Sequence, residues 1–450
     1  MRRIPLSVAL LALALYVSWF RVAASSGAVT VAPLLYTSTP QYDSEAWLHG
    51  AERFPAGSQV MLTASPQQRP LVSGFAATAD ANVSFDGTRV LFAGKKTAQE
   101  AWQVWEVAIT GGNARQITKC VGDCVRPFYL PGGFFVYAEK VRDRFVLQRG
   151  EFESGNTLQL SYAPGNAMPT DVLRDGRILF EAGFPMGSGS SPEIYTVYSD
   201  GSGVEAYRCD HGPRRQAGKQ STTGEIVFAS DKGAARFTSA RAKQAEMNMP
   251  AGEFAGDAVQ TSTNGWVVAW RPDATAHYSL QNWDPTTGAL APFMSGGANM
   301  VQPAVVAPRP LPNQHPSGLH DWVYANLLCL NTYTSKHKIP QGSVASAKLY
   351  TADDNGWPKL LGMSPVEKDG SFYVQVPGDK PLQIELLDAE GKTVQRELGW
   401  WWLRKGEQRI CVGCHAGPER APENAVPQVL VKSVKPVAMA GAATTNKGGK

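Results

Sequence analysis

The 450-residue sequence has few charged side chains, which make up 18% of it, and it has no strong excess of either sign. Its formal net charge is only +4 at pH 7, so it lacks the basic footprint of a nucleic-acid-binding protein. Low charge combined with 43% hydrophobic residues argues against a disordered chain. A mean hydropathy of −0.22 argues against many membrane spans. The composition predicts a soluble, globular protein.

Glycine and proline are frequent, with 44 and 31 residues. Both concentrate in turns, so their abundance indicates many turns and a mostly β architecture rather than long helical bundles. A chain of this length is expected to form two or three folded units.

The amino-terminal segment has the features of a secretory signal peptide. Arg2 and Arg3 precede an apolar run over residues 4–20, and small residues follow at 23–26. Residues 1–26 are therefore predicted to be removed on export, which would place the protein in the periplasm or outside the cell. An uncleaved membrane anchor is the alternative, because the run is at the lower limit of spanning length.

A turn that ends in glycine and leads into an apolar strand recurs five times. The five turn glycines are Gly87, Gly133, Gly176, Gly224 and Gly265, and the strands after them begin at Val90, Phe135, Ile178, Ile226 and Val267. These strands start at intervals of 41 to 48 residues. That period is typical of one four-stranded propeller blade.

Residues 84–92, with the sequence Ser-Phe-Asp-Gly-Thr-Arg-Val-Leu-Phe, resemble the repeat of TolB-like β-propellers. The resemblance extends over residues 30–308 and implies about six blades. The sixth blade would combine an amino-terminal strand near 60–62 with a closing strand near 301–306. A two-sheet sandwich is the competing all-β architecture. Propellers serve binding, scaffolding and catalysis alike, so the fold alone assigns no function.

Clustered prolines at residues 308–312 indicate a linker, and 309–345 is predicted to lead into a second domain. Three short candidate strands follow at 346–350, 371–376 and 383–387. They predict a small β-sandwich over residues 346–398. The tail at 426–450, rich in Ala, Lys, Gly and Thr, is predicted to be disordered.

The segment 399–425 contains the clearest chemical motif, Cys411-Val412-Gly413-Cys414-His415. Two thiols at this spacing can each add to a vinyl group of haem, and the adjacent histidine can bind the iron. The motif therefore predicts one covalently bound haem c, with Cys411 and Cys414 as thioether positions and His415 as proximal ligand. A thioredoxin-type redox pair would need a βαβ setting, and a structural zinc site would need a second ligand pair. A Cys411–Cys414 disulfide would leave His415 unexplained.

Aromatic and basic residues precede the motif. Trp401 and Trp402 could pack on the porphyrin and exclude water, which raises the reduction potential, or they could seal the core of the β-domain. Arg409 could pair with a haem propionate or lie on a solvated surface.

The order of a TolB-like propeller, Cys329, the segment Asp369-Gly370-Ser371-Phe372-Tyr373 and the haem pentapeptide resembles the middle and carboxyl-terminal part of hydrazine synthase alpha subunits. It is similar also to a broad set of exported bacterial proteins with this layout. The resemblance implies an electron-transfer haem with two protein ligands. Because this sequence has a single haem-attachment pentapeptide, the second haem on which catalysis in that family depends has no counterpart, and hydrazine synthesis is not transferred.

A six-coordinate haem needs a second axial ligand from histidine or methionine. The candidates on the sequence are His211, His315, His320 and His337, followed by His49, His277, Met363 and Met439. If none of them binds, the iron keeps an open position for small molecules.

Four further cysteines, Cys120, Cys124, Cys209 and Cys329, form an even set in an oxidising compartment. Cys120 with Cys124 is the most local pairing, and a metal or redox site is the functional alternative.

The sequence predicts an exported monohaem c-type cytochrome that transfers single electrons to or from a redox partner, such as another exported cytochrome or a membrane complex. The propeller would supply the docking surface. A haem enzyme acting on peroxide or a small nitrogen compound is the first alternative, and a binding scaffold with a structural haem is the second. No nucleic-acid partner is expected, and membrane contact is expected only if the signal segment stays uncleaved.

Overall fold

The structure is a computed structural model of the 450-residue chain. It describes residues 32–49, 51–64, 67–183, 191–208, 212–240, 242–262, 265–335, 337–353, 355–413 and 424–442. The predicted signal peptide lies outside the described residues. Within these ranges, no helix is both long enough and apolar enough to cross a bilayer.

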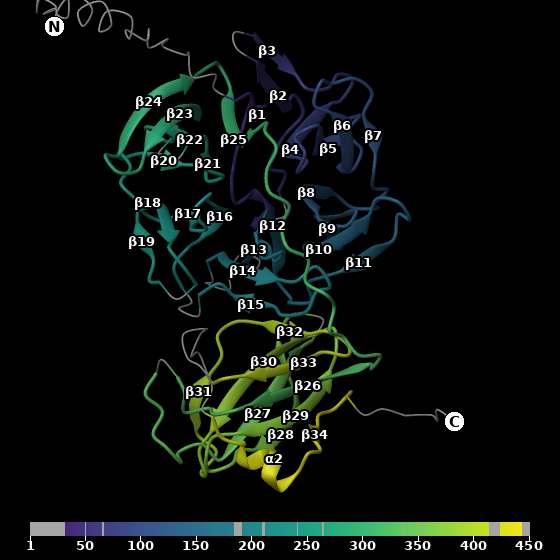
Figure 1. The fold of residues 1–450 in the computed structure, drawn as a ribbon, viewed down its shortest axis with the longest axis vertical. Coiled ribbons are helices and arrows are strands. Elements are labelled where there is room, and N and C mark those ends of the chain that lie inside the picture. Colours follow the sequence, from purple (N-terminus) through teal and green to yellow (C-terminus); the bar gives the residue numbers. More distant parts are fainter. Residues whose placement is uncertain are drawn as a thin grey trace, which may run out of the picture. The chain divides into compact units, whose positions relative to one another are not determined.

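Six antiparallel sheets form the blades of a β-propeller (Figure 1). Blade I contains β4 (Ala77–Val83), β5 (Arg89–Lys95), β6 (Gln103–Ala108) and β7 (Arg115–Gln116). Blade II contains β8 (Cys124–Leu130), β9 (Phe134–Val141), β10 (Arg144–Glu151) and β11 (Thr157–Gln159). Blade III contains β12 (Asn166–Val172), β13 (Ile178–Gly183), β14 (Glu193–Val197) and β15 (Glu205–Ala206).

The last three blades complete the circle. Blade IV contains β16 (Gln216–Gln220), β17 (Ile226–Ser230), β18 (Gly233–Phe237) and β19 (Ala245–Glu246). Blade V contains β20 (Glu253–Phe254), β21 (Val259–Gln260), β22 (Trp266–Arg271), β23 (Ser279–Asp284) and β24 (Ala289–Met294). Blade VI joins β25 (Asn299–Val305) to β1 (Leu34–Thr39), β2 (Gln59–Ala64) and β3 (Gln67–Pro70). The predicted propeller and its sixth blade, closed by strands from both ends of the repeat region, are confirmed.

The first strand of each blade is interrupted by a register shift or a break. Five of these interruptions hold a non-glycine residue at positive φ: Asp80 (58°), Arg126 (50°), Ala217 (50°), Asp257 (53°) and Gln302 (56°). A β-bulge changes the direction in which its side chain points. A strained backbone conformation persists only where contacts with neighbouring residues stabilise it.

These re-aimed side chains meet in a buried ionic network. Arg126 of blade II donates from Nη1 to Glu181 Oε1 of blade III at 3.0 Å, and from Nη2 to both oxygens of Asp257 of blade V at 3.0 and 3.2 Å. Glu181 Oε2 accepts the backbone N–H of Ala217 in blade IV at 2.9 Å. Lys219 Nζ lies 3.4 Å from Asp257 Oδ1.

Blades I and VI join the same network through Asp80. Its Oδ2 accepts Arg53 Nη2 at 2.6 Å and the backbone N–H of Arg126 at 3.1 Å, and its Oδ1 accepts Gln302 Nε2 at 2.6 Å. All six blades therefore contribute to one set of hydrogen bonds and ion pairs. Burial alone would raise the pKa of Asp80, but Arg53 and Arg126 with the hydrogen bond from Gln302 hold that pKa below its ordinary value.

The segment between β1 and β2 fills a further part of the propeller core. It contains the short 3₁₀ helix η1 (Ala46–His49). Trp47, Leu48 and Phe54 are buried and belong to one hydrophobic cluster with Ala79, Val125 and other residues of the innermost strands. The middle of the propeller is thus packed with side chains.

A two-sheet β-sandwich follows the propeller. One sheet has the order β33 (Gln408–Cys411), β26 (Tyr324–Cys329), β29 (Phe372–Pro377) and β34 (Val437–Ala438). The other contains β28 (Pro358–Pro365), β27 (Ser346–Ala352), β30 (Lys380–Leu387), β31 (Thr393–Arg396) and β32 (Trp401–Leu403). The predicted small sandwich is present.

Its extent differs from the predicted range 346–398 in three places. β26 lies within the predicted linker at 309–345, and β32 and β33 lie within the predicted haem segment at 399–425. The prediction of a disordered tail at 426–450 is wrong for its first part, because α2 (Gln428–Lys432) forms there and β34 pairs with β29. Residues 443–450 lie outside the described residues.

Candidate functional site

The first cysteine of the haem motif ends an edge strand of the sandwich. β33 runs parallel to β26, with Asn326 opposite Gln408 and Cys329 opposite Cys411. Cys411 is partly buried and packs against the hydrophobic core between the two sheets. A local β-strand therefore fixes the direction of the first predicted thioether position.

The surroundings of Cys411 keep its thiol protonated. Burial raises the pKa of Cys411 to about 11, and the carboxylates of Glu397, Glu407 and Glu205 act in the same direction, while Arg409 opposes them. Glu205 belongs to blade III, so the thiol lies within electrostatic range of the propeller.

The chain beyond Cys411 is tightly packed at Gly413. A side-chain carbon at this position would collide with the carbonyl oxygens of Thr334 and Asn331, so only glycine fits there. Cys414 and His415, the second thioether position and the proximal ligand of the prediction, lie outside the described residues.

Trp402 joins the sandwich to blade III. Its side chain is 1% exposed, its Nε1 donates to the Gly201 carbonyl at 3.0 Å, and its ring centroid lies 6.1 Å from Tyr162 and 6.3 Å from Phe180. Trp401 is partly buried, donates from Nε1 to Glu397 Oε2 at 2.6 Å and packs against the cores of both parts. Contact of either tryptophan with a porphyrin stays a prediction.

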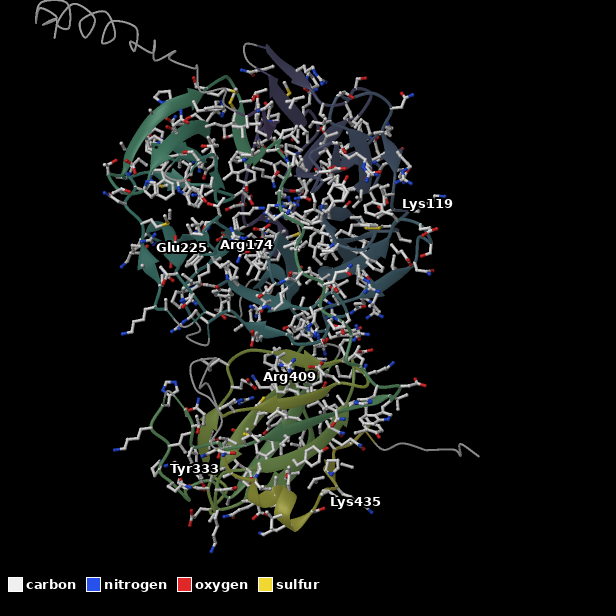
Figure 2. All side chains as sticks on the ribbon, in the orientation of Figure 1. Lys119, Arg174, Glu225, Tyr333, Arg409 and Lys435 are labelled. Atoms are coloured by element: carbon white, nitrogen blue, oxygen red, sulfur yellow. A yellow bond between two sulfur atoms is a disulfide. The ribbon has the colours of Figure 1, made fainter. Side chains whose placement is uncertain are left out.

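Arg409 also connects the two parts of the chain (Figure 2). Its Nη2 donates to Glu407 Oε1 at 2.7 Å, and its Nη1 donates to the Val204 carbonyl of the propeller at 3.1 Å. The role predicted for Arg409 in binding a propionate is not tested by these contacts, but they show that its guanidinium is already engaged.

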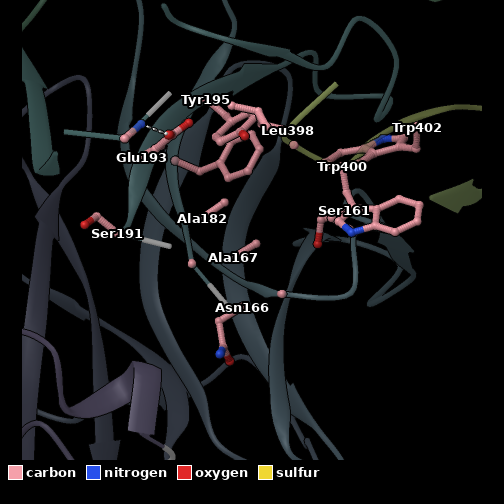
Figure 3. A pocket seen from close by; sticks show the side chains of 16 residues that line it. Ser161, Asn166, Ala167, Ala182, Ser191, Glu193, Tyr195, Leu398, Trp400 and Trp402 are labelled. Atoms are coloured by element: carbon pink, nitrogen blue, oxygen red, sulfur yellow. Dashed lines mark hydrogen bonds between the residues drawn. The ribbon is translucent and has the colours of Figure 1, made fainter. Parts of the chain in front are cut away.

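A largely apolar cavity of about 220 Å³ lies beside this junction (Figure 3). One side is formed by blade III, including Ala167, Ala182 and Tyr195. The other side is formed by the segment Leu398, Gly399, Trp400 and Trp402. Trp401, which lies between the cavity residues Trp400 and Trp402, packs against the sandwich core that Cys411 also contacts. Trp402 was predicted as a residue that packs on haem, and nothing in the sequence predicted the cavity.

The predicted axial histidines lie in different settings. His315 is exposed and stacks on Tyr198, with ring centroids 3.8 Å apart. His320 is exposed, stacks on Trp322 at 4.3 Å, and its Nε2 lies 3.1 Å from Gln408 Nε2 in the strand that carries Cys411. His337 is exposed, and its backbone N–H donates to Ser335 Oγ at 3.2 Å.

His211 lies outside the described residues, although the adjacent Gly212 lines the cavity. The other candidates on the sequence, His49, His277, Met363 and Met439, do not line it. Met439 is buried in the sandwich core against which Cys411 also packs.

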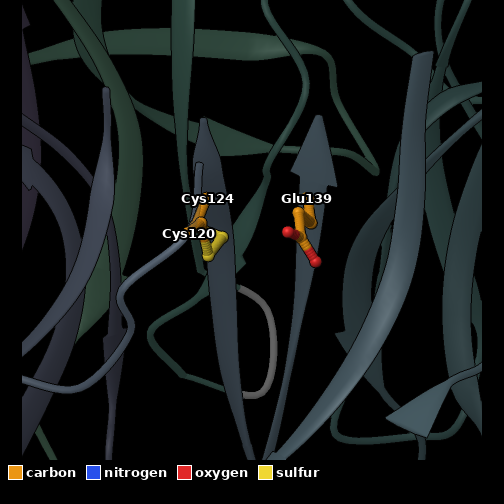
Figure 4. Close-up of side chains that lie close together, drawn as sticks. All are labelled: Cys120, Cys124 and Glu139. Carbon is orange, nitrogen blue, oxygen red and sulfur yellow. A yellow bond between two sulfur atoms is a disulfide. The ribbon is translucent and has the colours of Figure 1, made fainter. Parts of the chain in front are cut away.

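The most local cysteine pairing is confirmed. Cys120 and Cys124 form a disulfide, and Glu139 lies beside it (Figure 4). Both sulfur atoms are covalently joined, so this group has no thiolate to offer a metal in the oxidised state.

These features define a class: a six-bladed propeller linked to a β-sandwich whose edge strand ends at Cys411, the first cysteine of the predicted pentapeptide. Comparison with known proteins gives a more specific likeness. Residues 329–416, less than a quarter of the chain, match the family described as the hydrazine synthase alpha subunit middle domain. The chain resembles the hydrazine synthase alpha subunit, and the haem pentapeptide lies inside the matched region.

The curated subunit alpha of hydrazine synthase from Kuenenia stuttgartiensis is 41% identical over 61 residues, which are 14% of this chain and 8% of that protein. The chain thus matches only a small part of this relative's length. A solved Kuenenia stuttgartiensis hydrazine synthase structure superimposes with a TM-score of 0.74 at 18% identity, covering 89% of this chain and 72% of that one. TolB from Acinetobacter baumannii gives a TM-score of 0.43 at 12% identity, covering 62% and 67% of the two chains.

Proposed function

We propose that this protein is an exported c-type cytochrome that carries one haem and transfers single electrons, with the propeller as the surface on which its redox partner docks. The observation that carries the proposal is the pentapeptide at 411–415, whose first cysteine ends an edge strand of the sandwich. Haem, when bound, supplies a one-electron redox centre.

The described residues fit such a group. Cys411 would hold it together with Cys414, and His415 would bind the iron. The buried side chains of Trp400 and Trp402 beside the apolar cavity would limit access of water, which favours the reduced form of a cytochrome.

Export is part of the proposal. The basic pair Arg2 and Arg3 and the apolar run at 4–20 support it, and covalent haem attachment normally takes place outside the cytosol. Sequencing the amino terminus of the secreted protein tests it. A mature chain that begins near residue 27 is expected, whereas a chain that retains its first residues would show an uncleaved anchor.

Haem attachment is tested by producing the full chain in a bacterium that attaches haem to exported proteins. A denaturing gel stained for haem peroxidase activity should show a band at the mass of the protein. The variant with Cys411→Ala and Cys414→Ala together should show protein at that mass without stain. An unstained wild-type band would refute the proposed function.

A second function is favoured by one observation. The pentapeptide falls within the region that matches the middle domain of an enzyme subunit, and the fold superimposes on a hydrazine synthase with a TM-score of 0.74. We therefore propose, as the alternative, a haem enzyme with an open iron position that acts on peroxide or a small nitrogen compound.

Optical spectra separate the two functions. Low-spin bands that do not change with cyanide or carbon monoxide support electron transfer, because both axial positions are then filled. A high-spin ferric spectrum that responds to these ligands supports the enzyme. The likeness to one subunit of hydrazine synthase also supports a protein partner, which co-purification from the native periplasm would identify.

A further inference from the structure

The cavity between blade III and the segment 398–402, called the slot below, has a lining that suits a flat apolar group. Small residues form one wall: Ala163, Gly165, Ala167, Ala182 and Gly183. Aromatic residues line the rest of the space: Phe180, Tyr195, Trp400 and Trp402. A wall with almost no side chains lets a planar ring approach the backbone closely, and aromatic rings offer offset stacking to such a group.

The walls of the slot are held in place by contacts outside it. Trp402 is fixed to Gly201, and Arg404 donates from Nε to Asp379 Oδ1 at 2.7 Å while its Nη1 donates to the Asp200 carbonyl. These bonds connect the sandwich directly to blade III. The slot is therefore built into the fold and does not need a ligand to form.

The segment that forms one wall of the slot packs against the same core as the first thioether position. Trp401, which lies between the slot residues Trp400 and Trp402, packs against the sandwich core that Cys411 also contacts and against the core of blade III. Leu398 is 72% exposed although it is apolar, which fits a residue at the slot opening that a bound group would cover.

Charge gives the slot an orientation. Glu193 lines it, is 7% exposed, and accepts the backbone N–H of Gly212 at 2.9 Å through Oε1. Haem carries two anionic propionates on one edge and apolar methyl and vinyl groups on the others. None of the described residues that line the slot is a Lys, Arg or His that could pair with a propionate, so an apolar edge should enter.

We propose that this slot receives an apolar edge of the porphyrin that is attached at Cys411, with Trp400 against the ring and the propionates directed away from Glu193. The cavity of about 220 Å³ is smaller than the roughly 300–1,000 Å³ of ordinary ligand sites, so it takes one edge and leaves the remainder of the ring outside. This inference rests on the proposed haem attachment.

The test compares two slot variants with matched controls in the full exported chain. Ala182→Phe fills the slot, and Ala114→Phe introduces the same ring at a partly buried alanine of blade I. Leu398→Glu places a charge at the opening of the slot. Its control is Leu311→Glu, which places the same charge at a leucine that is 64% exposed and lies in the linker. Because Leu398 is exposed, its variant keeps the test valid if Ala182→Phe does not fold.

The measurements are haem per chain from the stained gel, the Soret circular dichroism and the midpoint potential. Covalent haem should remain in both slot variants, because the thiols are unchanged. Both should lose at least half of the Soret circular dichroism and have a lower midpoint potential, since the ring is more exposed to water, while both controls match the wild type. Slot variants that stain for haem and match the wild type would overturn the slot proposal alone. A wild type without covalent haem would refute the proposed function itself.

Discussion

Arg126 binds Asp257 through two hydrogen bonds of 3.0 and 3.2 Å, and this pair connects blades II and V. Both side chains are about 6% exposed, and both residues have positive φ. Arg126 also binds Glu181 of blade III, so one guanidinium ties three blades together. Removing one partner of such a group leaves buried charges without compensation, which costs far more than the loss of an exposed pair.

Arg126→Gln should therefore lower the free energy of unfolding by about 3–5 kcal/mol. Arg115→Ala is the control, because Arg115 pairs with Glu106 from a side chain that is 60% exposed and should lose less than about 1 kcal/mol. Urea denaturation followed by tryptophan fluorescence measures both. If the two variants lost the same amount, the buried network would not stabilise the propeller.

The indole of Trp402 should be needed to hold the sandwich against blade III. Trp402→Ala removes a buried ring and its hydrogen bond to Gly201 and should cost about 3–5 kcal/mol. Trp357→Ala should be close to neutral, since Trp357 is 71% exposed. The same denaturation experiment measures both variants. Limited proteolysis should cut the connection between β25 and β26, residues 306–323, faster in the Trp402 variant only. An unchanged cleavage rate would show that other contacts suffice.

The pKa of Cys411 predicts how the reactivity of its thiol changes with pH. A pKa of about 11 means that thiolate, the reactive form, is scarce near pH 8 and increases as the pH rises toward 11. In the haem-free Cys414→Ser variant, alkylation of Cys411 by iodoacetamide should accelerate steeply between about pH 9 and 11, as measured by mass spectrometry of the 411 peptide. In urea the same peptide should follow the ordinary thiol pKa of about 8.5. Equal pH profiles in the two conditions would contradict the burial of this thiol.

The strands that local signals mark were predictable from the sequence, and those that depend on distant partners were not. The turns at Gly87 and Gly176 precede apolar runs that became β5 and β13. β26 was missed because its partners, Phe372–Pro377 and Gln408–Cys411, lie far along the chain. The ordered strand β34 was hidden by a composition rich in small residues and lysine, although it adds to β29.

Only the residues proposed to bind haem and its iron could be predicted from the sequence. The pentapeptide identifies Cys411, Cys414 and His415 without any knowledge of the fold. The five residues with positive φ in the innermost strands recur at about the spacing of the blades. They are Asp, Arg, Ala, Asp and Gln, so no repeated residue type marks these positions in the sequence. The cavity is formed where residues 398–402 meet blade III, about 200 residues earlier, and only the folded chain brings those segments together.

The second axial ligand of the proposed haem can be identified from the spectra of histidine variants. Among the predicted histidines, His315 and His320 are exposed and stacked on Tyr198 and Trp322, whereas Gly212, next to His211, lines the apolar cavity. We predict His211, one of the four axial candidates from the sequence, as the residue that binds the iron. His211→Ala should change a low-spin ferric spectrum to a high-spin one and allow cyanide to bind, because it opens one axial position. His315→Ala and His320→Ala should keep the low-spin bands, and a low-spin spectrum in the His211 variant would assign the ligand to another residue.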